Sequence, residues 1–243
     1  MSLTGLRQRR LIPELMDQPG LDGETHRRAL RALSRINRIS NSAGIVYGPI
    51  RDMAIQHTGP EPLRVLDIAC GGGDVTAACA ARAKAEGLPI AFEGCDLSDT
   101  ALDLAREHAE RRGVSATFFR HDMINDPLSR EYDIVMCSLF LHHLKDAEAL
   151  ELLTNMRISS RKFILVNDII RSPIGLFLAY FAGNVFTRSH VVRFDAPASV
   201  RGAFTMDEAR ALAEQAGLSN AQIKWCWPWR FLLHWTHPHE PPP

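Results

Sequence analysis

From residue 63 onward, short runs of β-branched residues and leucine alternate with stretches whose apolar positions recur at helical spacing. The short runs predict strands, and the longer stretches predict helices that bury one face. The predicted strands cover residues 63–68, 90–96, 116–120, 133–138 and 162–167, and the predicted helices cover residues 75–86, 99–112 and 146–157. Strands that alternate with helices favour a parallel sheet with helices on both faces.

The N-terminal part has a different pattern. Residues 25–40 carry an apolar stripe at a spacing near 3.6 residues, which predicts an amphipathic helix. A second short helix is predicted over residues 47–57, and the proline-containing stretch 58–62 marks a boundary. Residues 1–51 hold nine arginines and four acidic residues, an imbalance that fits either a solvated helix face or an acidic partner or membrane surface. We predict that residues 1–58 form a helical cap or lid.

The C-terminal part ends the main domain with a change of strand direction. Residues 205–216 have helical spacing, and residues 221–227 and 230–235 predict two strands of an antiparallel hairpin. The main domain is therefore predicted to cover residues 59–237, and residues 238–243 are predicted to be a disordered tail.

An apolar run at residues 174–186 lies within a predicted lid insertion at residues 169–204. The run fits a buried helix, and it also fits the wall of a lipophilic pocket. It is too short to cross a bilayer, so the sequence predicts no transmembrane segment.

Composition narrows the class of protein further. The chain has 243 residues, is 46% hydrophobic and has a formal net charge of zero, which disfavours a nucleic-acid partner. Its five cysteines are an odd number without CxxC spacing, so reduced thiols in a cytoplasmic protein are expected. The N-terminus lacks the apolar segment of a signal peptide.

A glycine-rich turn follows the first predicted strand, in the sequence Asp67-Ile68-Ala69-Cys70-Gly71-Gly72-Gly73-Asp74. Glycine allows a tight turn and a close approach by a ligand at the carboxyl end of a strand. A dinucleotide fingerprint would need a further glycine where Thr76 stands, and the carboxylates of Asp67 and Asp74 would repel a pyrophosphate. These carboxylates suit a ligand with a cationic amine and a sulfonium, such as S-adenosylmethionine (SAM), better than the nicotinamide cofactor of an oxidoreductase.

Acidic residues also follow the next two predicted strands. Asp96 and Leu97 end the second strand, and Asp122 and Met123 follow the third. A carboxylate after the second strand can accept hydrogen bonds from ribose hydroxyls, and one after the third can accept a bond from an adenine amino group. A single aspartate after a strand usually caps a loop or helix, but acids at three successive strand ends favour one nucleoside site.

The stretch from residue 63 to about residue 145 resembles the class I SAM-dependent methyltransferases. The glycine-rich turn is similar to their first motif, and the fourth-strand motif is similar to Tyr132-Asp133-Ile134-Val135-Met136-Cys137-Ser138-Leu139-Phe140-Leu141-His142-His143-Leu144. The resemblance implies an α/β fold with a seven-stranded, mostly parallel Rossmann-like sheet in the order 3-2-1-4-5-7-6, strand 7 being antiparallel. It implies SAM as the cofactor, with contacts from Asp67, Ala69, Cys70, Gly71, Gly73, Asp96, Leu97, Asp122, Met123, Cys137 and Ser138.

The resemblance is closest to the branch that methylates quinone precursors, phenols and polyketides. Residues 14–17 and 189–205 are similar to bacterial relatives that act on polyketide-like phenols. The expected function is methyl transfer from SAM to a hydroxyl of a small phenolic, quinone-like or polyketide-like acceptor, by a monomer or homodimer. C-methylation of a quinone precursor and a non-catalytic SAM-binding protein are the alternatives. A methylase of nucleic-acid bases is disfavoured, because the sequence after the fourth strand lacks its Pro-Pro-aromatic motif. No metal site is predicted, because the chain shows no zinc spacing.

Transfer to a phenol benefits from a base, since an unperturbed phenol has a pKa of about 10. His142 and His143 follow the fourth strand, and His143 is the slightly favoured candidate, although a packing or capping role for either fits as well. His190 is a reserve candidate, with Asp195 as a possible orienting carboxylate, unless the pair lies in a surface loop. Asn167 and Asp168 end the fifth strand. They are either polar contacts to the methyl acceptor, possibly together with Arg171, or simply a turn after the strand.

Overall fold

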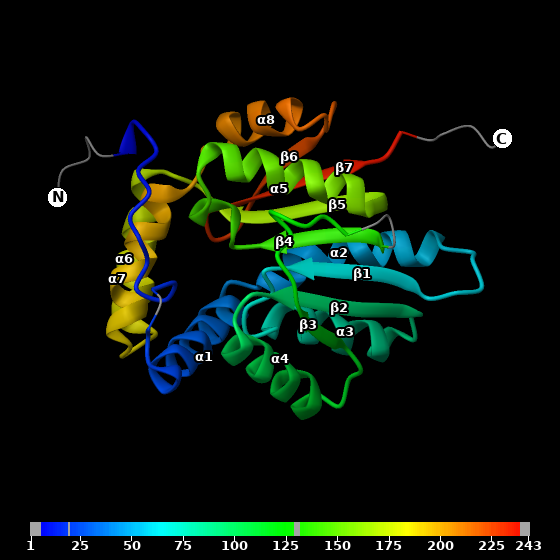
Figure 1. Ribbon diagram of the computed structural model, residues 1–243, viewed down its shortest axis with the longest axis horizontal. Helices are drawn as coiled ribbons and strands as arrows, with labels where there is room; N and C mark the ends of the chain where they lie inside the picture. Colours follow the sequence, from blue (N-terminus) through cyan, green and yellow to red (C-terminus); the bar gives the residue numbers. More distant parts are fainter. Residues whose placement is uncertain (1–5, 19, 129–131, 239–243) are drawn as a thin grey trace.

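The computed structural model describes residues 6–18, 20–128 and 132–238, and its centre is one mixed sheet of seven strands (Figure 1). Strand β7 runs antiparallel to both of its neighbours, and the other pairs are parallel. The predicted strand order and the antiparallel strand 7 are confirmed. In spatial order the strands are β3 (Thr117–Arg120), β2 (Ile90–Asp96), β1 (Leu63–Ile68), β4 (Tyr132–Ser138), β5 (Ser160–Ile169), β7 (Arg230–Thr236) and β6 (Gln222–Cys226).

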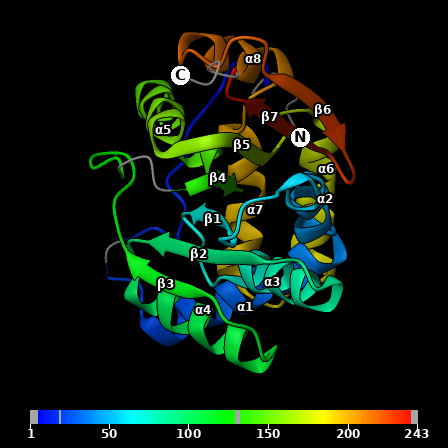
Figure 2. The same cartoon turned by 90° about the vertical axis from the view of Figure 1, so that its right-hand side faces the viewer.

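Helices cover both faces of the sheet, as Figure 2 shows from the end. α2 (Ser42–Gln56) and α3 (Asp74–Glu86) pack on one face, and α5 (Asp146–Ser159) and α8 (Met206–Gln215) pack on the other. Successive side chains of β1 point to opposite faces of the sheet. Val65 lies in the core beneath α2 and α3, and Leu66 lies in the core beneath α5 and α8. α4 (Asp99–Arg111) packs beside α3 and against Phe118 of β3.

The remaining helices lie beyond the carboxyl ends of the parallel strands. α1 (Gly23–Ile39) packs on α4, while α6 (Pro173–Val185) and α7 (His190–Gly202) lie side by side at one end of the molecule (Figure 1). Residues 6–18 and 20–22, which we call the N-terminal strap, run along this helix pair. Nothing in the described ranges forms a helix long and apolar enough to span a membrane.

The insertion between β5 and α8 departs from the sequence predictions in two ways. The sequence predicted no helix over residues 190–202, yet α7 begins under a Ser189 cap and continues through Pro197. Burial of Val191 and Val192 against α1 stabilises this helix through tertiary contacts that its proline obscures in the sequence. The apolar run was interpreted as a buried helix, whereas α6 buries only Gly175, Leu176 and Gly183 and leaves its other residues partly or fully exposed. The predicted tail falls almost entirely on residues 239–243, which lie outside the described residues.

Candidate active site

The glycine-rich turn lies between β1 and α3 and requires left-handed backbone. Gly71 and Gly73 have φ values of 52° and 64°, and a Cβ on Gly73 would lie 2.5 Å from the Cβ of Ala105 on α4. Only glycine fits there without a shift of α4. The backbone N–H of Gly71 donates to Asp96 Oδ2 at 2.9 Å, so the first turn and the end of β2 form one cradle.

Three carboxylates converge on this cradle. Asp96 also accepts a bond from the Ser98 backbone N–H at 2.9 Å, and burial raises its pKa. Asp67 is 2% exposed, and burial raises its pKa to about 7. Thr76 donates to one oxygen of Asp67, whereas the other oxygen has no hydrogen-bond partner among the described residues. Burial likewise raises the pKa of Asp74. A buried, partly unpaired set of carboxylates favours a ligand that brings positive charge.

The residues predicted to hold the rest of the nucleoside lie in two different environments. Leu97 is exposed beside Asp96, whereas Met123 belongs to the buried core. Asp122 accepts bonds from its neighbours Ile124 and Asn125, and the Asn125 side chain lowers its pKa most strongly. This geometry matches a loop cap, and it does not test a contact with adenine.

The residues predicted at the end of β4 are also not equivalent. Cys137 is fully buried in the core, whereas Ser138 is only partly buried as a residue. The Oγ of Ser138 is itself buried and has no hydrogen-bond partner within the described residues. Ala69 and Cys70 lie in the first turn, where Ala69 adopts a φ of 50° and the backbone N–H of Cys70 donates to the Cys95 carbonyl.

α1 covers the cradle from the solvent side. The side chain of Leu30 lies 3.9 Å from the position that a Cβ on Gly71 would take, and Asn37 donates to Asp74 at 3.3 Å. Burial lowers the pKa of His26, and the charges of Asp96 and Asp17 oppose this effect. His26 therefore lies near Asp96 of the cradle and near Asp17 of the N-terminal strap.

His142 and Asp168 form a buried pair at the adjacent ends of β4 and β5. The Nδ1 of His142 lies 2.7 Å from Asp168 Oδ1, and the backbone N–H of His142 donates to Asp168 Oδ2 at 3.0 Å. Burial alone would raise the pKa of Asp168, but His142 and two backbone donors lower it instead. An ionised Asp168 only accepts, so the proton of a neutral His142 resides on Nδ1 and its Nε2 carries a free lone pair.

His143 has a different partner from that of His142. Its Nδ1 lies 2.8 Å from Asp17 Oδ2, and its ring centroid lies 4.3 Å from that of His142. Burial alone would lower the pKa of His143, but the bond to Asp17 and the charge of Glu14 raise it to about 9. His143 is therefore a cation at neutral pH.

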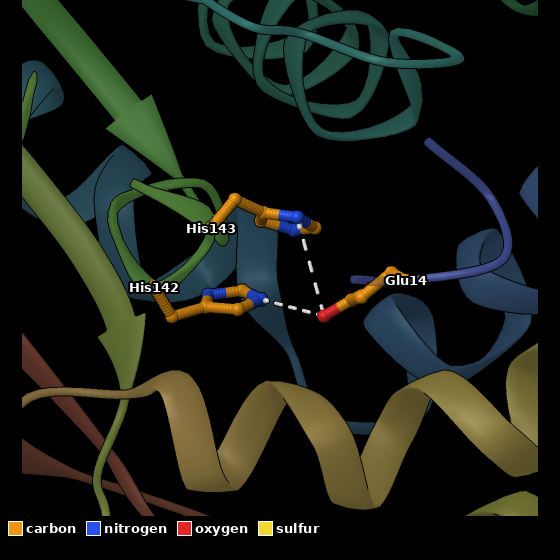
Figure 3. Close-up of side chains that lie close together, drawn as sticks. All are labelled: Glu14, His142 and His143. Atoms are coloured by element: carbon orange, nitrogen blue, oxygen red, sulfur yellow. Dashed lines mark ion pairs between the residues drawn. The ribbon is translucent and has the colours of Figure 1, made fainter. Parts of the chain in front are cut away.

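Glu14 points its carboxylate toward both histidines (Figure 3). Its Oε1 is 3.9 Å from His142 Nε2 and 4.0 Å from His143 Nδ1, and it accepts a bond from Ser199 Oγ at 2.5 Å. Sequence analysis did not select Glu14 or Asp17 as site residues, although both lie in the segment that is similar to phenol-methylating relatives. Asp17 and His143 are 126 positions apart in the sequence, so no local pattern would join them.

The N-terminal strap is fixed over this site by contacts to α7. The carboxylate of Asp195 accepts bonds from the backbone N–H groups of Leu15 and Met16, at 2.7 and 3.1 Å. Asp195 is thus a partner of the strap, and the expectation that it orients His190 is wrong. His190 lies exposed at the start of α7.

Arg171 was considered, together with Asp168, as a polar contact to the methyl acceptor, but its guanidinium is occupied elsewhere. Arg171 is 4% exposed, and its guanidinium donates to the carbonyls of Leu6 and Ala203 and to the Glu208 carboxylate. It ties the strap to α8 and does not contribute a polar group to the histidine site.

The histidine site also has the donor atoms of a metal site. One atom each from Glu14, His142 and His143 lies within 4.8 Å of the others. The Nδ1 of His143 lies 4.0 Å from Glu14 Oε1 and 2.8 Å from Asp17 Oδ2, so a metal on that nitrogen would have to displace the proton shared with Asp17. The arrangement therefore favours proton chemistry over metal binding.

Comparison with known proteins places these features in a family. Residues 65–161 match the model of a methyltransferase domain. The ubiquinone biosynthesis O-methyltransferase of Methylococcus capsulatus is 34% identical over 101 residues, which cover 40% of each chain. That of a Ruegeria species is 30% identical over 166 residues, or 67% of this chain and 62% of the relative. The match to the first relative thus spans about two fifths of its length.

A solved structure extends the likeness of fold over nearly the whole chain. The magnesium protoporphyrin IX methyltransferase of Synechocystis, with bound SAH, superposes with a TM-score of 0.55 at 15% identity. The superposition covers 91% of this chain and 90% of the other. At this identity the likeness concerns the fold alone.

Proposed function

We propose that this chain, which belongs to the class I SAM-dependent methyltransferases, transfers the methyl group of SAM to a hydroxyl of a small phenolic, quinone-like or polyketide-like acceptor. The observation that carries the proposal is the position of the buried His142–Asp168 pair at the same edge of the sheet as the acidic glycine cradle. The cradle fits the donor, and the histidine fits removal of a hydroxyl proton.

The cradle residues fit SAM by their charge and shape. Gly71 and Gly73 leave room for close approach, Asp96 is placed to accept the ribose hydroxyls, and the unpaired oxygen of Asp67 suits a nearby positive charge. When bound, SAM supplies an electrophilic methyl group on a sulfonium. α1 lies over the cradle and would limit the access of water to bound SAM, which would favour transfer to the acceptor over loss of the methyl group to solvent.

His142 is the proposed base, in preference to its neighbour. Asp168 keeps the proton on Nδ1, so Nε2 is free to take the proton of an acceptor hydroxyl that enters beside Glu14. His143 has a pKa of about 9 and is already protonated, so it is a poor base at neutral pH. Its positive charge instead stabilises the phenolate that forms as the proton leaves.

The acceptor class is supported by the relatives and by the strap. Two of the relatives are O-methyltransferases of ubiquinone biosynthesis, whose names point to a phenolic ring. Glu14 reaches the histidines from a segment that has no regular secondary structure at that position. Such a segment is suited to move aside for an acceptor and to close again over it.

Incubation with SAM and a panel of phenols, hydroquinones and hydroxylated polyketide analogues tests the proposal. Mass spectrometry should detect a product heavier by one CH2 unit, and NMR should place the new methyl group on oxygen. The His142→Ala variant should lose turnover but retain affinity for SAM in calorimetry. Product methylated on carbon would refute O-methylation, and SAM binding without product from any acceptor would favour a non-catalytic protein.

A further inference from the structure

Large apolar side chains gather at the surface of α6 and α7. Phe177 is 68% exposed, which is unusual for a phenylalanine in a folded domain. Neighbouring members of the group touch. The rings of Phe181 and Phe186 pack edge to face, with their centroids 6.0 Å apart. We call the group the α6–α7 patch; it consists of Ile174, Phe177, Phe181, Val185, Phe186 and Phe194.

The patch follows one outer face of α6. Ile174, Phe177, Phe181 and Val185 are spaced by three or four residues, so they form a single stripe along the helix. The opposite side of α6 packs against α7. A Cβ atom placed on Gly183 would lie 3.3 Å from the Cα of Arg193. α6 has no charged residue at any position, so water meets an apolar surface along its whole length.

Within the segment that forms the patch, every formally charged side chain is an arginine. No aspartate or glutamate occurs between residues 169 and 194. Arg188, His190 and Arg193 are exposed at the end of α6 and the start of α7. Arg193 donates to the carbonyls of Gly183 and Thr187, which holds its guanidinium at the C-terminal end of α6. An apolar stripe flanked by cations is complementary to a bilayer interface that carries anionic headgroups.

A second copy of the chain fits this surface less well. A symmetric contact through the patch would bring Arg188 and Arg193 of both copies together, and the segment from 169 to 194 offers no carboxylate to pair with them. The helix pair also lies at one end of the molecule, where it can meet a broad surface without obstruction by the sheet (Figure 1). We propose that the α6–α7 patch docks the protein on the surface of a membrane containing anionic phospholipid.

Docking there would bring the bilayer next to the histidine site. α7 carries Asp195 and Ser199, which hold the strap and Glu14 respectively. A lipophilic acceptor dissolved in the bilayer could therefore reach His142 by a short path. The docking surface itself requires neither SAM nor an acceptor, so it can be tested apart from the proposed function.

Flotation with vesicles tests the docking surface. Wild-type protein is mixed, without SAM or acceptor, with vesicles of phosphatidylcholine and phosphatidylglycerol in equal amounts, or of phosphatidylcholine alone. Binding is expected to the mixed vesicles and to be much weaker to the neutral ones. The double variant F177S/F181S should bind the mixed vesicles more than tenfold more weakly, since both rings would leave the interface. Arg188→Gln should weaken binding about fivefold, because one cation near an anionic surface contributes about that factor.

Ile55→Ser is the matched control. Ile55 is 56% exposed on the last turn of α2, which leads into the amino end of β1, whereas α6 follows the carboxyl end of β5. It should bind vesicles like the wild type, and circular dichroism should show that all variants are folded. Absence of wild-type binding, equal binding to neutral vesicles, or unchanged binding by F177S/F181S would each overturn the proposal. So would a wild-type dimer that F177S/F181S converts to a monomer in analytical ultracentrifugation.

Discussion

Replacing Asp168 with asparagine tests the proposed base most directly, because the substitution keeps the shape of the side chain and removes its charge. In the structure both oxygens accept from N–H groups: Oδ1 from His142 Nδ1 and the Ile169 backbone, and Oδ2 from the His142 backbone. An asparagine can offer only one acceptor oxygen at this position. Its NH2 group must therefore face a donor, and at least one of the three bonds to the carboxylate cannot form.

Either orientation of the amide impairs His142. If the NH2 group faces Nδ1, the ring must carry its proton on Nε2 and cannot accept one from the substrate. If the oxygen faces Nδ1, the ring keeps its tautomer but loses the negative charge that stabilises its protonated form. General base catalysis contributes about 10²- to 10⁴-fold, so kcat should fall by that factor, equivalent to about 2.7–5.5 kcal/mol at 1.36 kcal/mol per tenfold.

The assay compares kcat for the best phenolic acceptor with the affinity for SAM measured by calorimetry. Asp168→Asn should lower kcat without weakening SAM binding, since Asp168 contacts none of the cradle residues by a hydrogen bond. Asp207→Asn is the matched control, because Asp207 is 94% exposed and pairs with Arg210 at the surface. A folded Asp168→Asn protein with wild-type kcat would refute the assignment of His142 as the base.

Three further outcomes are expected. Asp96→Ala should weaken SAM binding by about 1–3 kcal/mol through loss of charge-assisted hydrogen bonds to ribose, as measured by calorimetry; unchanged affinity would contradict the placement of the ribose. The pKa of about 9 for His143 lies above its ordinary value of 6.5, so its pairing stabilises the fold fully below pH 6.5 and is lost as the pH rises through 9. Chemical denaturation should show about 1–2 kcal/mol of this loss, allowing for screening of the exposed Asp17, and a flatter curve for Asp17→Asn; equal slopes would contradict the pairing. Gly73→Ala should destabilise the protein by about 2–4 kcal/mol, because its Cβ meets α4 in left-handed backbone, whereas Gly87→Ala, also left-handed but with open space around it, should cost about 1 kcal/mol; equal thermal shifts would argue against the close contact.

The sheet was predictable because each strand carries its own evidence. β1 and β2 begin and end where the sequence places them, since their apolar runs stop at the residues that turn toward the ligand cradle. β5 extends two residues beyond its predicted range at each end, because pairing with β4 and β7 recruits residues whose own pattern is weak. α7 was not predicted at all, since the packing that stabilises it comes from α1, more than a hundred residues earlier in the chain.

The histidine pair shows why site chemistry was harder to predict than fold. His142 and His143 are adjacent in sequence and follow the same strand, so no local pattern distinguishes their roles. The distinction comes from two carboxylates on different segments, Asp168 at the end of β5 and Asp17 on the strap. The buried Asp168 fixes a neutral tautomer with a free Nε2, whereas Asp17 holds its neighbour as a cation. In the proposed mechanism, a base and an electrostatic stabiliser would thus arise from the same residue type, through contacts that only the folded chain creates.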